Sequence, residues 1–164
     1  MDTVTVPAES GALAAGEVLE DEVLIVAAKA AWPFYQHAAA YITHNERTFR
    51  PTTRMGFYSS RTIYPAFPLI LRRHDNVMID EQTAAVLLLS LNADEQRLGS
   101  IVKAAVDYGW GTDLLTVLVL TAIDDPRTLR TPEIHHDGAN AYTMNQRYAQ
   151  LGSLLRAKTT ADLQ

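Results

Sequence analysis

The chain has 164 residues, a formal net charge of −5 and no cysteine, which excludes disulfides, thiolate zinc sites and cysteine nucleophiles. Its length and 48% hydrophobic content predict a single globular domain over residues 16–164, preceded by a flexible arm over residues 1–15. The acidic first 22 residues lack the basic start of a secretory signal, and Lys29 and Pro33 interrupt the most apolar window, residues 23–42. We therefore expect a cytoplasmic protein with no membrane partner.

The first half of the chain predicts one helix followed by short strands. An acidic first turn and the position of Pro33 predict a helix over residues 17–31. Short apolar and aromatic segments bounded by turn-forming residues predict strands over residues 38–43, 55–60 and 69–73, with a further short strand over residues 77–79.

The middle of the chain carries two helices with clear start signals. Asp80 can cap a helix over residues 81–91, and Asn92 with Glu95 forms a capping box for a helix over residues 93–108. The second helix has one apolar stripe at helical spacing, formed by Leu98, Ile101, Val102 and Ala105. We expect this stripe to be buried.

The last third of the chain predicts a buried strand and a final helix. Residues 114–122 (LLTVLVLTA) show no alternation, which favours a central strand buried on both faces. After the irregular residues 123–142, Thr143 and Gln146 form a second capping box and predict a helix over residues 144–158. That helix is expected to bury Met144, Tyr148, Leu151 and Leu155.

This order of elements predicts an α+β fold with a short mixed sheet, in which residues 114–122 form the central strand and the four predicted helices cover mainly one side. The alternative is an incomplete parallel α/β sheet. In that fold, residues 79–114 would form the crossover between two parallel strands.

A local reversal of charge is the most informative feature of this acidic chain. Residues 44–75 carry six arginines, five phenylalanines or tyrosines and no lysine. Arginine forms forked bonds to phosphate or carboxylate and stacks on flat rings. We therefore predict a face that binds an anionic ligand, built from His44, Arg47, Arg50, Arg54, Tyr58, Arg61, Arg72 and Arg73. The alternative is a solvated sheet edge that happens to use arginine.

A second candidate site lies in residues 124–138, just after the predicted central strand, where open parallel sheets place their ligands. Carboxylates and imidazoles so close together could act as general acid and base or bind a divalent metal. The candidate catalytic residues are Asp125, Glu133, His135 and His136. The same residue types also form turns, and the pattern identifies neither a complete set of metal ligands nor a cofactor.

Three functions follow from these patterns. The leading hypothesis is binding of an anionic small molecule, a nucleotide or nucleic acid by the arginine segment. The second is a phosphodiesterase- or nuclease-like hydrolase that uses residues 124–138. The third is an adaptor that docks a protein partner. If the segment is a ligand face, Arg47, Arg54 and Arg61 should project to one side and remain accessible.

Overall fold

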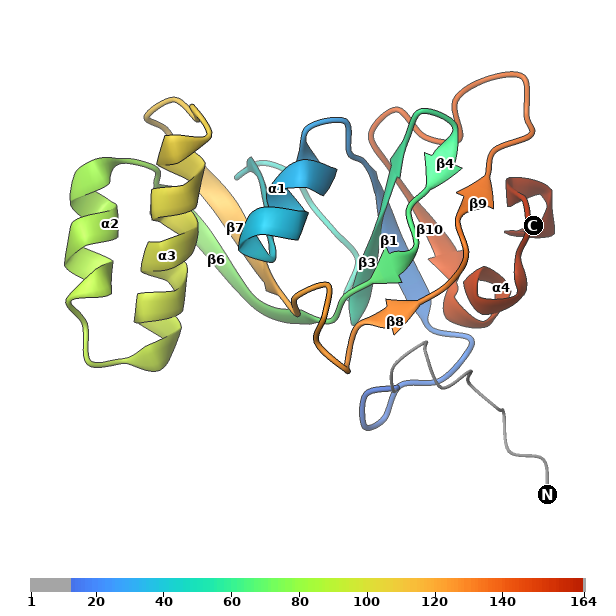
Figure 1. Cartoon of the computed structure of the whole chain (residues 1–164), viewed down its shortest axis with the longest axis horizontal. Helices are drawn as coiled ribbons and strands as arrows, with labels where there is room; N and C mark the ends of the chain where they lie inside the picture. The colour runs from blue at the N-terminus through green and yellow to red at the C-terminus, as the bar shows by residue number, and fades with distance from the viewer. Residues whose placement is uncertain (1–12, 164) are drawn as a thin grey trace.

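The structure, a computed structural model, describes residues 13–163 and shows an α+β fold (Figure 1). A five-stranded mixed sheet, sheet A, has the strand order β10-β1-β3-β4-β9. A three-stranded antiparallel sheet, sheet B, has the order β2-β7-β6, and a further pair is formed by β5 and β8. Of the predicted flexible arm, residues 1–12 lie outside the described residues.

The strands of sheet A are β1 (Glu22–Ala27), β3 (Arg54–Ser59), β4 (Thr62–Ile63), β9 (Ile134–His135) and β10 (Gln146–Gln150). Sheet B contains β2 (Ala40–His44), β6 (Ile70–Met78) and β7 (Leu114–Leu120), and the small pair contains β5 (Ala66–Phe67) and β8 (Leu129–Arg130). The helices are α1 (Ala31–Ala38), α2 (Glu81–Leu88), α3 (Ala93–Asp107), α4 (Leu151–Arg156) and the 3-10 helix η2 (Thr160–Leu163). None of the helices in the described part of the chain has the length and apolarity needed to cross a bilayer.

The predicted helix over residues 17–31 is wrong, because this segment forms β1 and the helix α1 begins only at Ala31. β1 pairs in parallel with β3 and antiparallel with β10, so it is an inner strand of sheet A. Residues 23–26 are buried, with their side chains divided between two hydrophobic clusters. An apolar run without alternation suits such a doubly covered strand. Pro33 lies in the first turn of α1, where its missing N–H removes no intrahelical bond.

The prediction that residues 114–122 form a buried central strand is confirmed for β7, which is the middle strand of sheet B. Alternate side chains of β7 enter two hydrophobic clusters. Val117 belongs to the cluster that contains α3, and Leu118 belongs to the cluster that contains β1 and β3. The alternative of a crossover over residues 79–114 is wrong, because β6 and β7 are direct antiparallel neighbours.

The predicted helices α2 and α3 are confirmed together with their caps. Asp80 Oδ1 accepts a hydrogen bond from Thr83 N (2.7 Å), and Asn92 Oδ1 accepts one from Glu95 N (3.1 Å). The predicted apolar stripe of α3 is buried in the same cluster as β7, and Ile101 is only 1% exposed. The hairpin formed by α2 and α3 therefore covers the face of sheet B on which Val117 lies.

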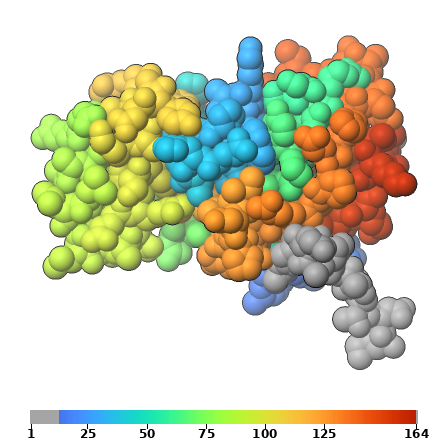
Figure 2. Space-filling model, in the orientation of Figure 1, coloured from blue at the N-terminus to red at the C-terminus, as the bar shows by residue number. Residues whose placement is uncertain are grey.

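Helix α2 leaves large aliphatic side chains exposed. Val86, Leu89 and Leu91 in and after α2 are 63%, 84% and 100% exposed, whereas Ala84 is buried. Figure 2 shows residues 81–107 as a lobe at the left end of the molecule. Exposed apolar surface of this kind is typical of contact surfaces between proteins.

The predicted helix over residues 144–158 is partly wrong. Residues 146–150 form β10, the edge strand beside β1, and α4 follows directly. The expected capping box does not form, because the side chain of Gln146 accepts a hydrogen bond from Arg47 Nε (2.7 Å). Met144, expected in the core, is 90% exposed.

Candidate functional site

Arg54, predicted to bind a ligand, is a buried structural residue. Its side chain is 0% exposed and pairs with Glu17 (Nε–Oε2 2.9 Å), and its Nη1 donates to the carbonyls of Phe67 and Arg127, both at 2.7 Å. A guanidinium is tolerated in a core only where its charge and donors are matched in this way. Tyr58, further along β3, is also buried, at 5% exposure. Neither side chain can contact a ligand at the surface.

Arg61 holds the loop that precedes β10. Its Nη2 donates to the carbonyl oxygens of His136 (2.9 Å) and Gly138 (2.6 Å). The prediction that Arg47, Arg54 and Arg61 share one accessible side is therefore wrong. All three guanidinium groups donate to the protein's own backbone, since Arg47 Nη2 also bonds the carbonyl oxygen of Asn145 (2.8 Å).

Arg47, Arg50 and Arg73 instead gather around two aromatic rings. The guanidinium carbons of Arg47 and Arg73 lie 5.4 and 5.5 Å from the centroid of the Phe49 ring. That of Arg50 lies 3.9 Å from the centroid of the Tyr148 ring. All three distances fall within the range of cation–π attraction. The surface formed by these five residues is named the arginine–aromatic groove.

A cavity of about 290 Å³ lies along the arginine–aromatic groove. Leu24, Ile70 and Leu118 form its apolar floor. The rest of its lining consists of Phe49, Arg50, Pro51, Thr52 and Arg73. An apolar floor beside cationic side chains suits a ligand that carries both a flat ring and a negative charge.

The ion pairs in the groove are exposed and open to competition. Arg50 pairs with Glu22 (Nη2–Oε2 3.2 Å), and Arg73 pairs with Asp75 (Nε–Oδ1 3.0 Å). These four side chains are between 38% and 59% exposed. Because exposed pairs contribute only about 0–1 kcal/mol, an anionic ligand can displace either carboxylate.

Asp75 is held in place by the neighbouring strand. The hydroxyl of Thr116 on β7 donates to Asp75 Oδ1 (2.7 Å), the same oxygen that accepts from Arg73 Nε. The hydrogen bond from Thr116, together with that from Arg73, lowers the pKa of Asp75 below its ordinary value. Asp75 therefore keeps its negative charge throughout the neutral range.

Arg72 belongs to the other face of sheet B. Successive residues of a strand point to opposite sides, so Arg72 and Arg73 cannot serve one site. Arg72 lines a cleft beside α3 and pairs with Asp94 (Nε–Oδ2 3.4 Å). His44, also predicted to contact a ligand, is exposed at the end of β2.

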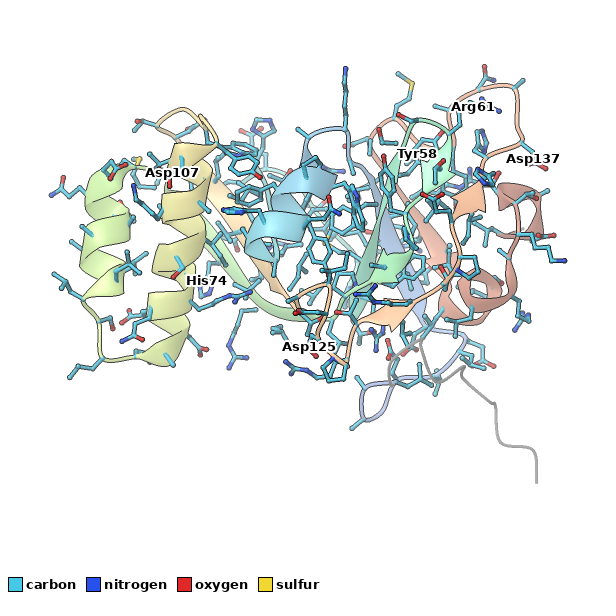
Figure 3. All side chains as sticks on the ribbon, in the orientation of Figure 1. Tyr58, Arg61, His74, Asp107, Asp125 and Asp137 are labelled. Atoms are coloured by element: carbon cyan, nitrogen blue, oxygen red, sulfur yellow. The ribbon has the colours of Figure 1, made fainter. Side chains whose placement is uncertain are left out.

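The candidate catalytic residues Asp125, Glu133, His135 and His136 do not converge. Glu133 and His135 are exposed, and the strands β8 and β9 carry the chain along the molecule between the first and last of these residues. In Figure 3, Asp125 lies at the lower edge of the molecule and Asp137, next to His136 in the chain, lies at its right-hand end, in the upper half. The loop therefore provides no shared cleft for Asp125 and His136.

Asp125 and His136 each have partners within the protein. Arg127 forms a fork with Asp125 (Nη2–Oδ2 2.8 Å, Nε–Oδ1 3.1 Å), and this pairing lowers the pKa of Asp125, which makes it a weak base. His136 Nδ1 bonds the hydroxyl of Thr160 (2.7 Å), and its Nε2 donates to the carbonyl of Asn140. The imidazole thus links the loop to η2.

Phe49 and Tyr148 are absent from the ligand-binding face predicted from the sequence. The spacing Arg-Thr-Phe-Arg at residues 47–50 could have indicated Phe49, because it places a ring between two arginines. Tyr148 has no comparable signal. It reaches Arg50 only because residues 146–150 form the strand β10 beside β1.

Comparison of the chain with protein-family models, with curated proteins and with solved structures finds no match. Within residues 13–163, no group of three or more histidine, cysteine, aspartate or glutamate side chains is arranged to hold a metal ion. The function must therefore be inferred from the geometry of the chain itself.

Proposed function

We propose that the protein binds an anionic ligand with a flat ring, either a nucleotide or a short single-stranded segment of nucleic acid, in the arginine–aromatic groove. The proposal depends on one observation. Arg50 follows β2, Arg73 belongs to β6, and the two line one cavity with an apolar floor, beside the ring of Phe49. Positive charge is thus concentrated where a ring can also be sheltered from water, in a chain of net charge −5.

The groove supplies both interactions that nucleotide recognition needs. A base can lie on Ile70 and Phe49, which are the partly exposed apolar side chains of the cavity, and stacking on an aromatic side chain contributes about 1–3 kcal/mol per base. A phosphate can take the place of Asp75 on Arg73 and accept two parallel hydrogen bonds from the guanidinium. The acidic residues 20–22 line the neighbouring hollow beyond Pro51. Their negative charge repels the phosphate of a ligand and favours its binding at the end of the groove where Arg73 lies.

Fluorescence anisotropy with short labelled RNA and DNA, and calorimetric titration with mononucleotides, test this function. We expect a dissociation constant below about 100 μM that rises with salt, because arginine–phosphate contacts release counterions. Arg50→Ala and Arg73→Ala should each weaken binding and flatten its salt dependence. Their circular dichroism and melting temperature should stay close to those of the parent protein.

Lys103→Ala is the matched control. It removes one positive charge from the exposed side of α3, where Lys103 pairs with Glu81 and Asp107. Binding should be unchanged in this variant. The proposal fails if no probe binds more tightly than about 100 μM, or if Lys103→Ala weakens binding as much as Arg73→Ala does.

The two alternative functions have less support. The phosphodiesterase- or nuclease-like hydrolase would need Asp125 and His136 in one cleft, but Asp125 lines the cleft beside α3 and His136 bonds Thr160 of η2. The adaptor is favoured by one observation, the exposed aliphatic surface that includes Leu89 and Leu91. A sedimentation coefficient that rises with protein concentration, and no longer does so in Leu89→Gln, would support a docking role for α2.

A further inference from the structure

A second group of arginines lies on the face of sheet B opposite the arginine–aromatic groove. A cleft of about 370 Å³ opens between β6, the first turns of α3, the end of β7 and the loop that follows it. Its charged side chains are Arg72, Asp94, Arg97, Asp125 and Arg127. We infer that this cleft binds a phosphorylated small molecule, with Arg72 and Arg97 holding the phosphoryl group.

Arg72 and Arg97 have only long contacts within the protein. Arg97 Nη2 lies 3.4 Å from the carbonyl oxygens of both Ala39 and Leu120, and Arg72 Nε lies 3.4 Å from Asp94 Oδ2. Hydrogen bonds from nitrogen to oxygen centre on about 2.9–3.0 Å, so these contacts are weak. A phosphate oxygen at ordinary distance would form stronger bonds to both guanidinium groups, since charge-assisted pairs are shorter and stronger.

Arg127 adds a fixed positive charge to the same cleft. Its forked pair with Asp125 and the bond from its own backbone N–H to that carboxylate (2.8 Å) hold the side chain in one orientation. The cleft contains three guanidinium groups and two carboxylates, an excess of one positive charge. This excess favours an anion over a neutral ligand or a cation.

The shape and lining of the cleft favour a phosphate attached to a small organic group. Leu71, Val119 and Ala122 provide apolar surface next to the arginines. Inorganic phosphate leaves this surface unused, and a volume of about 370 Å³ suits a small molecule. The arginines gather around one cleft, whereas a nucleic-acid backbone needs a basic groove that follows the strand.

Calorimetric titration and thermal unfolding with inorganic phosphate, glucose 6-phosphate, phenyl phosphate and glucose test the inference, with ionic strength held constant by chloride. At least one phosphate ester should bind more tightly than inorganic phosphate and raise the melting temperature, and glucose should have no effect. Arg72→Ala and Arg97→Ala should each weaken ester binding by about tenfold. Arg97→Lys should fall between them and the parent, because it keeps the charge but loses the planar fork.

Arg73→Ala is the control, because Arg73 lies on the opposite face of the same strand. It should leave ester binding unchanged, and Arg97→Ala should leave oligonucleotide binding in the groove unchanged. Failure at one site is therefore distinguishable from failure at the other. The inference is overturned if no ester gives a saturable response below about 10 mM, or if the response persists in both Arg72→Ala and Arg97→Ala.

Discussion

At the scale of single residues, arginine has three distinct roles in this protein. Arg54 is a buried ion pair, Arg61 fastens a loop through backbone carbonyls, and Arg50 and Arg73 stay accessible beside aromatic rings. Burial and the number of protein acceptors decide which role each residue has. A guanidinium surrounded by acceptors of the protein has little left for a ligand, whereas one exposed contact can be exchanged.

Arg54→Ala should be among the most damaging substitutions in the chain. It leaves the buried carboxylate of Glu17 without this ion pair, and breaking a buried pair costs about 3–5 kcal/mol. Urea unfolding at neutral pH measures the loss. Glu17→Leu combined with Arg54→Met should recover much of it, because no charge is then left in the core. A loss below about 1 kcal/mol for Arg54→Ala would contradict the structural role.

The lowered pKa of Asp75 predicts an effect on the acid side of the stability profile. Because its pKa is lower in the folded state than in the unfolded chain, its contribution to stability is present above the unfolded pKa of about 3.9. That contribution is lost as pH falls through the folded pKa. Thr116→Val should raise the pKa of Asp75 in an NMR titration of its carboxyl group. An unchanged titration would show that Thr116 has no part in the shift.

At the scale of secondary-structure elements, sheet B separates the two proposed binding sites. Its strand β6 sends Arg72 toward the cleft beside α3 and Arg73 toward the arginine–aromatic groove. β7 does the same with apolar residues, since Val117 and Leu118 enter different hydrophobic clusters. The packing of α3 on β7 therefore supports one wall of each site.

Ile101→Ala measures the strength of that packing. Ile101 is 1% exposed in the cluster that includes β7, so truncation should cost roughly 2–4 kcal/mol through lost transfer energy and a residual cavity. Leu89→Ala on α2 is the control, because its side chain is 84% exposed and should change stability by less than about 0.5 kcal/mol. Equal losses in the two variants would contradict the assigned core.

At the scale of the whole molecule, one hydrophobic cluster joins the two larger sheets. Leu24 of β1, Phe57 of β3 and Leu118 of β7 belong to it, and Trp32 of α1 packs against it. In Figure 1, α1 lies between the α2–α3 hairpin and sheet A. If either sheet unfolded alone, the apolar side chains of the other sheet in this cluster would be exposed to water. We therefore expect the chain to unfold as one cooperative unit.

Two single-tryptophan variants test this cooperativity. Trp110→Phe leaves Trp32 as the reporter between the sheets, and Trp32→Phe leaves Trp110 as the reporter at the end of α3. In each variant the fluorescence midpoint in urea should coincide with the midpoint from far-ultraviolet circular dichroism. If Trp110 changes at lower urea than the circular dichroism does, the helical hairpin unfolds separately.

Elements that depend on local interactions can be predicted from the amino-acid sequence alone. The caps of α2 and α3 join residues three apart in the chain, and the apolar stripe of α3 and the unbroken apolar run of β7 are visible without any partner. The α+β class follows from these elements and the short strands. The concentration of arginine in residues 44–75 is likewise a property of the sequence alone.

The strands β1 and β10, in contrast, form through tertiary contacts. They pair with each other although most of the chain lies between them, and this pairing overrides local helix signals. Tertiary contacts also decide which arginines remain accessible to a ligand. Arg54 forms a buried ion pair with Glu17 and is not accessible to a ligand, and Arg50 packs on the ring of Tyr148. Both contacts join residues far apart in sequence. Local sequence patterns do not predict such partners, because the burial and pairing of a side chain are set when distant segments of the chain pack together.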